Sequence, residues 1–261
     1  MRKYLIFLST EVKSAMAYRA DTWLTAVFSV FSVALSYLLW RAVFGQAETF
    51  NGFTLHQMTT YYLLSGILVP LTQSDGLLHD FSAEIKSGGF SKYLVKPMSP
   101  LAFFIAASFG RALLPTLMST TVLSIAMLTC GSYFQALHLV DVLQAIPVVL
   151  LGSLLSMVIA YIIALATFRF TDVGFLYAIN NVVKIFLAGS LIPLSLVFGP
   201  KLPLYSPFSY TVYYPVITLM GKSEVPLSTA LGVLTAWTIA LTMLALVLEK
   251  RAPRAFEGVG L

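Results

Sequence analysis

The stretch HDFSAEIKSGGFSKYLVKPMSP, residues 79–100, is a polar and basic interruption between two long apolar segments. Phe81 and Ile85 are four residues apart, which places both on one side of a helix. Gly88 and Gly89 then predict a turn, and a second short apolar pattern follows in residues 90–94. A connection that only joins two membrane helices does not need this shape. We therefore interpret residues 79–100 as a docking surface for a partner.

The composition of the chain defines the setting of this stretch. Of its 261 residues, 58% are hydrophobic and only 10% are charged, and the mean hydropathy is +0.87. Soluble domains carry about 25% charged residues, so the sequence predicts an all-α polytopic membrane protein with a single transmembrane domain over residues 1–261. The net charge of +5 is spread over short loops, which favours contact with anionic lipid and not with nucleic acid.

Six segments are long and apolar enough to cross a bilayer, which takes about 20 residues in a helix. They are residues 22–44, 59–78, 101–129, 142–168, 173–198 and 226–248. Residues 4–18 have the pattern of an amphipathic helix that lies in the membrane interface. Residues 199–225 carry several prolines among tyrosines, which predicts short helices that dip into the outer leaflet.

Lysine and arginine are distributed unequally between the connections. Eleven of them lie on one side: in the N-terminal arm, in residues 79–100, at Arg169 and in the C-terminal tail. The opposite side carries Arg41, Lys201 and Lys222. Because cytoplasmic loops carry the excess of positive charge, we expect both termini and residues 79–100 in the cytoplasm. The expected location is the cytoplasmic membrane.

Three charged residues, Asp75, Arg111 and Lys184, fall inside the predicted spans. A charge in the hydrocarbon region costs at least about 2.5–3.5 kcal/mol, so such side chains usually face the protein interior or water. They are candidates for a substrate path or a subunit seam. The alternative is that Asp75 lies near the cytoplasmic end of its span and that the long side chains of Arg111 and Lys184 reach toward the membrane surface.

Enzyme signatures are missing from the sequence. Gly221-Lys222-Ser223 resembles the end of a phosphate-binding loop, but Val216 stands where that motif needs glycine, so we interpret it as a turn. The three histidines lie in different loops, and the single cysteine, Cys130, can form neither an intramolecular disulfide nor a metal site alone. We predict no catalytic, cofactor or metal site in this chain.

The order of several short motifs is similar to that of a known family, the membrane permease subunits of ABC transporters of the type-2 exporter class. The likeness covers essentially the whole chain and rests on AYRAD at 17–21, EIKSGG at 84–89, YLVKP at 93–97 and the proline-rich segment 202–215. The chain is most similar to the branch of this family whose operons often encode two unlike permeases beside one ATPase.

The resemblance implies that ATP and magnesium are bound by a separate pair of ATPase subunits, and that a second permease, identical or paralogous, completes the transporter. It also implies a coupling helix between the second and third spans that inserts into the ATPase. The residues of this chain that would couple are Phe81, Glu84, Ile85, Lys86, Gly88 and Gly89.

The leading hypothesis is therefore ATP-driven export of a hydrophobic or amphipathic substrate. A membrane scaffold or immunity protein would need no ATPase, so an ATPase gene beside this one discriminates between the two. An ion-driven secondary transporter would show inverted repeats and carboxylates at mid-membrane, and an intramembrane enzyme acting on lipid would show a catalytic constellation. The sequence shows neither pattern clearly.

Overall fold

The computed structural model describes residues 9–14, 16, 19–73, 75–89, 99–170, 173–199 and 202–251. These residues are helical apart from turns, loops and one isolated β-bridge between Phe50 and Phe53. The helices are α2 (Arg19–Phe44), α3 (Leu55–Thr72), α4 (Asp75–Lys86), α6 (Pro100–Thr129), α7 (Leu139–Leu165), α8 (Gly174–Leu187), α9 (Leu194–Phe198), α10 (Tyr213–Leu219) and α11 (Leu227–Arg251). The predicted all-helical class is confirmed.

Four helical segments of the described residues are long and apolar enough to cross a membrane. They are Ala26–Phe44, Pro100–Thr129, Leu139–Phe168 and Leu227–Arg251. They correspond to the first, third, fourth and sixth of the predicted spans. Of the predicted interfacial helix at residues 4–18, the described residues 9–14 are helical.

The predicted second span, residues 59–78, is not one continuous helix. Helix α3 ends at Thr72, Gln73 has an extended backbone, and α4 begins at Asp75. The cause lies in the sequence QSDG at 73–76, because serine and aspartate compete for backbone hydrogen bonds and favour helix ends over helix interiors.

The predicted fifth span, residues 173–198, is also broken. Helix α8 stops at Leu187, and the short helix α9 begins only at Leu194. Gly189 has a φ of +79°, which other residues rarely adopt, and Pro193 precedes α9. The chain therefore turns back before it has completed a single 26-residue helix.

Helix α7 is the centre of the bundle. It packs against α3, α4, α6, α10 and α11, while α2, α3 and α6 form a neighbouring three-helix group. Gly152, Ser156, Ala160 and Ala164 form a stripe of small residues at every fourth position of α7, and all four are buried. On α7 this stripe serves contacts within the chain, as small residues at every fourth position allow.

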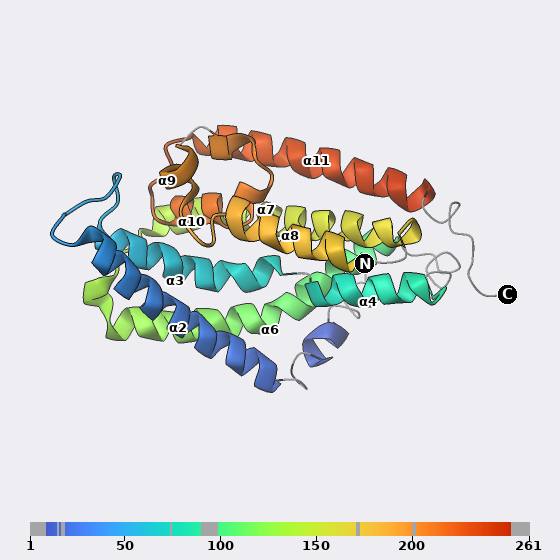
Figure 1. Ribbon diagram of the computed structural model, residues 1–261, viewed down its shortest axis with the longest axis horizontal. Helices are drawn as coiled ribbons and strands as arrows, with labels where there is room; N and C mark the ends of the chain where they lie inside the picture. Colours follow the sequence, from blue (N-terminus) through green and yellow to red (C-terminus); the bar gives the residue numbers. More distant parts are fainter. Residues whose placement is uncertain are drawn as a thin grey trace.

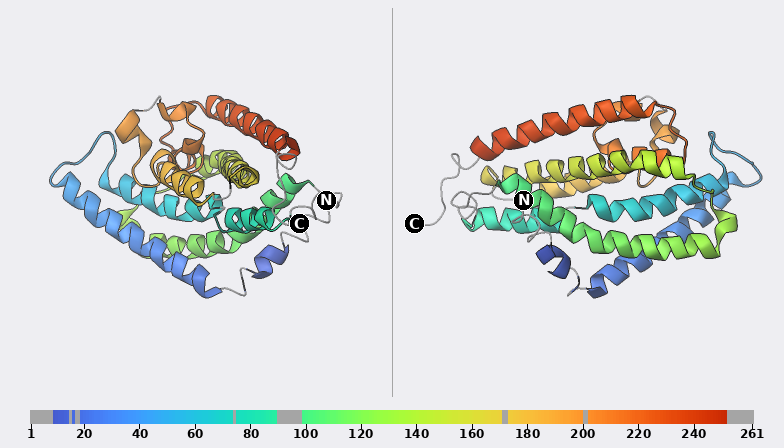
Figure 2. Two further views of the ribbon diagram at one scale, coloured as in Figure 1. Left: turned by 45° about the vertical axis from the view of Figure 1, so that its right-hand side comes forward. Right: turned by 180° about the vertical axis from the view of Figure 1, so that it is seen from behind.

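The long helices run along the longest axis of the molecule, which gives it two distinct ends (Figure 1). Helix α4 and the last turn of α11 lie at one end, which we name the α4 end. Helices α9 and α10 and the loop that precedes α3 lie at the other, the α10 end, and the further views agree (Figure 2).

Candidate functional site

Helix α4 occupies most of the first half of the stretch predicted to dock a partner. Phe81 and Ile85 are 2% and 0% exposed and face the core. The ring of Phe81 lies 5.5 Å from those of Phe104 on α6 and Tyr161 on α7, measured between centroids. These two predicted coupling residues therefore fix α4 to the bundle, and their side chains are not available to touch a partner.

The opposite face of α4 is the one that a partner can reach. His79, Asp80, Ala83 and Lys86 are exposed, and Glu84 is half-buried. An amphipathic helix of this kind buries its apolar stripe and presents its charges outward. Glu84 and Lys86 are thus placed as the prediction requires.

The glycine pair ends α4 as a turn. Gly88 has a φ of +74°, and its N–H donates to the carbonyl of Ile85 over 3.1 Å. Gly89 lies so close to the last turn that a Cβ there would be 3.3 Å from the Glu84 carbonyl oxygen. Residues 90–98, which include the second half of the predicted docking surface, lie outside the described part of the chain.

Arg111 connects three segments at the α4 end. Its Nε donates to Glu11 Oε2 over 2.6 Å, and its Nη1 donates to Asp80 Oδ2 over 2.7 Å. The guanidinium of α6 therefore joins the N-terminal helical segment to the exposed face of α4. Arg111 was predicted to lie on a substrate path or a subunit seam, and its described partners are carboxylates of its own chain.

Glu249 is a residue that the sequence analysis did not single out. Its Oε2 accepts hydrogen bonds from the hydroxyl of Tyr161 over 2.8 Å and from the backbone N–H of Leu101 over 3.2 Å. A carboxylate at a helix N-terminus satisfies a free N–H and interacts well with the helix dipole. Glu249 thereby ties the end of α11 to α6 and α7 beside the aromatic cluster.

Lys184 lies beside the end of α3, where the predicted second span is broken. Its Nζ donates to the carbonyl of Thr72 over 3.3 Å, and Ser156 Oγ donates to the same oxygen over 2.8 Å. The last turn of α3 thus gains donors from both α7 and α8. Asp75, the third predicted intramembrane charge, begins α4, and its side chain is not among those described.

Two hollows adjoin along α3 and share Val69, Gln73 and Ser190. One, of about 390 Å³, lies against α2, and the other, of about 270 Å³, reaches Lys184 and Asn181 on α8. We name the two together the α3 groove. Hydroxyl and amide groups in its walls would be costly against lipid tails, so this side of the bundle favours contact with water or protein.

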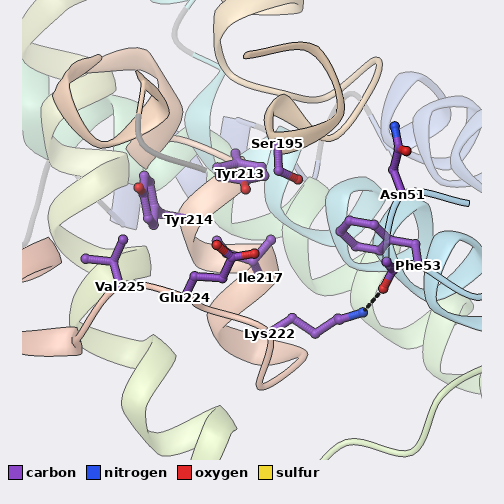
Figure 3. Close-up of a pocket in the computed structure, with 10 residues that line it drawn as sticks. Asn51, Phe53, Ser195, Tyr213, Tyr214, Ile217, Lys222, Glu224 and Val225 are labelled. Carbon is purple, nitrogen blue, oxygen red and sulfur yellow. Dashed lines mark hydrogen bonds between the residues drawn. The ribbon is translucent and has the colours of Figure 1, made fainter. Parts of the chain in front are cut away.

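A third hollow, of about 200 Å³, lies at the α10 end (Figure 3). It is lined by Asn51, Gly52, Phe53, Ser195, Tyr213, Tyr214, Ile217, Lys222, Glu224 and Val225. We name it the α10 pocket. Its walls come from the loop before α3, from α9, from α10 and from the loop before α11, so four separate parts of the sequence build it.

Lys222 holds one edge of the α10 pocket. Its ammonium donates to the carbonyl of Gly52 over 2.7 Å and to Gln57 Oε1 over 2.6 Å, and lies 4.4 Å from the centre of the Phe53 ring. Burial lowers the pKa of Lys222, while the charge of Glu224 acts in the opposite direction. The sequence analysis took residues 221–223 as a turn, and the structure adds a link between two loops.

These features describe a multi-pass helical membrane protein with a charged surface helix at one end and polar hollows along its spans. The match to known families gives the same class. The model of the ABC-2 family transporter proteins matches residues 30–260, so the chain belongs to this family and is an ABC-2 type permease. No curated protein and no solved structure matches the chain.

Membership in this family confirms the resemblance drawn from the sequence. Permeases of this kind are membrane transport components that work with an ABC ATPase. Among the described residues, no group of three or more His, Cys, Asp or Glu side chains is placed to hold a metal ion.

Proposed function

We propose that this chain is the permease subunit of an ATP-driven exporter in the cytoplasmic membrane, and that α4 is the helix through which an ATPase dimer acts on it. In this proposal α3 and the broken α8–α9 segment complete six crossings, both termini lie in the cytoplasm, and a second permease completes the path. The substrate is hydrophobic or amphipathic, and ATP and magnesium are bound by the ATPase. Export as the direction follows from the resemblance to the type-2 exporter class.

The observation that carries the proposal is the two-sided construction of α4. Its inner face is locked into aromatic rings of α6 and α7, and its outer face presents Glu84 and Lys86. Because the inner face is held by close packing, a displacement imposed on α4 is transmitted to α7, the central helix of the bundle. A movement of α4 caused by the ATPase would thereby reach the spans directly.

Charge reversal on the outer face of α4 tests this proposal. The chain carrying Glu84→Lys together with Lys86→Glu is co-expressed with its ABC ATPase. We expect co-purification of the ATPase and stimulation of ATP hydrolysis to fall at least tenfold, because like charges replace the complementary ones.

The matched control is Glu48→Lys, which reverses an exposed carboxylate in the loop at the α10 end. It should leave both measurements unchanged. If the α4 double variant binds and stimulates the ATPase as the natural chain does, α4 is not the coupling helix. A chain that binds no ATPase at all would favour the scaffold hypothesis.

The α3 groove supports a path that is shared with a second permease. Gln73 is exposed in its wall, whereas Leu38 on α2 is 59% exposed on an apolar face suited to lipid. In a Cys130→Ser background, Gln73→Cys should react with a membrane-impermeant maleimide, because a thiol ionises only where water reaches it. Leu38→Cys should stay unlabelled, and equal labelling of the two would rule out a water-filled groove.

The orientation is tested with the natural cysteine. Cys130 is exposed and follows α6 at the α10 end. On intact cells an impermeant maleimide should label it from outside. Labelling that needs permeabilised cells would place the α10 end in the cytoplasm and reverse the proposed topology.

A further inference from the structure

The α10 pocket contains a buried hydroxyl group that the protein itself does not satisfy. Tyr214 is 1% exposed, and its hydroxyl has no hydrogen-bond partner in the described part of the chain. A buried polar group left without a partner costs about 1–3 kcal/mol. A ligand in the pocket would satisfy this group.

Three neighbouring tyrosines at the α10 end have partners for their hydroxyl groups. Tyr210 stacks on Tyr214 with centroids 4.7 Å apart, and its hydroxyl donates to the carbonyl of Leu204 over 2.9 Å. The hydroxyl groups of Tyr61 and Tyr62 donate to carbonyls of the segment between α8 and α9. Of these four tyrosines, Tyr214 is the one that lines the pocket and the one whose hydroxyl has no partner among the described residues.

The charges of the pocket define what kind of ligand fits. Glu224 makes no hydrogen bond or ion pair with any described residue, and its carboxylate points toward Tyr213 and Ser195 (Figure 3). Lys222 is fixed at another edge by its two hydrogen bonds, and an ammonium has three donors, so one remains. A simple cation would be repelled by Lys222 and a simple anion by Glu224, whereas a zwitterion satisfies both.

We propose that the α10 pocket binds a zwitterion that carries a primary ammonium and an oxyanion a few atoms apart. The ammonium of the ligand donates to Glu224, its oxyanion accepts from Lys222, and the hydroxyls of Tyr214 and Ser195 complete its hydrogen bonds. A water needs roughly 10–15 Å³ of such space, so about 200 Å³ accommodates a group of several heavy atoms. The headgroup of an ethanolamine phospholipid and a small free zwitterion share this chemistry.

The site has a consequence for the α10 end as a whole. A ligand held by Ser195, Tyr214 and Glu224 joins α9, α10 and the loop before α11, so its binding should stabilise the segment between α8 and α11. This inference does not depend on ATP coupling, and its test contains no ATPase.

The purified full-length protein is tested by thermal unfolding in detergent with glycerophosphoethanolamine as the free probe, and in nanodiscs of phosphatidylcholine with and without phosphatidylethanolamine. We expect a rise in melting temperature with the ethanolamine compounds. Glycerophosphocholine should give a smaller rise, because its quaternary ammonium has no N–H to donate. A response only in nanodiscs identifies a lipid headgroup as the source, and a response only in detergent identifies a free zwitterion.

Two variants separate ligand binding from structure. Tyr214→Phe removes a hydroxyl without an internal partner, so the ligand-free protein should be as stable as before, while affinity for the ethanolamine probe falls about tenfold. Glu224→Gln should reduce affinity by a similar or larger factor. The control Tyr210→Phe loses its bond to Leu204, so it should lower stability without changing affinity.

The inference is overturned if neither ethanolamine compound raises the melting temperature of the natural chain. It is equally overturned if Tyr214→Phe and Glu224→Gln respond to the probe as the natural chain does. An α4 double variant that still binds and stimulates the ATPase would contradict the proposed function and leave this result unaffected.

Discussion

The two ends of the molecule are held together by different kinds of contact. At the α4 end, side chains meet side chains: the ring of Phe81 packs on Phe104 and Tyr161, and Arg111 pairs with carboxylates. At the α10 end, most of the hydrogen bonds that join separate described segments have a backbone atom on one side. The hydroxyl of Tyr61 donates to the carbonyl of Gly189, and the N–H of Tyr213 donates to the carbonyl of Ala188.

This difference follows from the regularity of the backbone at each end. A regular helix satisfies its own backbone and needs only an apolar face to dock, whereas a broken chain within the membrane must satisfy its freed N–H and C=O groups from outside. The α10 end therefore needs hydrogen bonds to backbone carbonyls in addition to its packed rings, whereas rings and charges join the segments of the α4 end. The four predictions below test this contrast, starting with the largest expected effect.

Phe81→Ala should reduce the stability of the protein by about 3–5 kcal/mol, because it leaves a cavity among well-packed rings. Unfolding in detergent, followed by intrinsic fluorescence, measures the change. Val27→Ala on the exposed side of α2 is the control and should have little effect. A small effect of Phe81→Ala would mean that rings do not hold the α4 end.

Gly152→Ala should reduce stability by about 2–3 kcal/mol. A Cβ at this position of α7 would overlap the carbonyl of Tyr210, and a backbone atom cannot move aside as a flexible side chain can. Gly232→Ala on α11 is the matched control, since a Cβ there meets no atom within 4 Å. It should stabilise by roughly 0.5–1 kcal/mol through helix propensity. If Gly152→Ala and Gly232→Ala change stability equally, close contact with the backbone does not stabilise the α10 end.

Tyr61→Phe should cost about 1–2 kcal/mol, because it leaves the buried carbonyl of Gly189 without a donor. Tyr62→Phe breaks the corresponding bond to Leu191 at a more exposed place. It should therefore cost less. Thermal shifts of the two variants, compared side by side, measure the difference, and the reverse order would contradict the assignment.

Arg111→Gln should cost about 1 kcal/mol or less, because Arg111 and Asp80 are 36% and 58% exposed and water screens their attraction. A clearer readout is limited proteolysis of the N-terminal segment, which should be cut faster once Glu11 is released. Combining Arg111→Gln with Asp80→Asn measures the coupling directly. Additive effects would show that the ion pair contributes nothing.

Much of the α4 end could be predicted from sequence because its pattern is local. The spacing of Phe81 and Ile85 predicted an amphipathic helix, and Gly88-Gly89 predicted the turn that follows. The partners of Arg111 could not be predicted, since Glu11 and Asp80 are 100 and 31 residues away along the chain. Glu249 was missed for the same reason, because its partners lie on α6 and α7.

The breaks in two spans were harder to foresee. Hydropathy averages over a window and does not distinguish one long helix from two shorter pieces, so residues 59–78 and 173–198 each appeared as a single span. The local signals were present in QSDG at 73–76 and in Gly189 and Pro193. Glycine and proline are common in intact membrane helices too, which is why composition alone did not decide. The unpartnered hydroxyl of Tyr214 has no sequence signal, since its surroundings come from four distant segments.

The carbonyl oxygen of Thr72 has a further consequence for the α3 groove. An oxygen at the C-terminal end of a helix carries part of the negative end of the helix dipole, and the ammonium of Lys184 lies against it. Since Lys184 belongs to α8 and Thr72 to α3, a shift of α8 along its axis separates the two charges. The position of α8 relative to α3 therefore sets the electrostatic potential in this part of the groove.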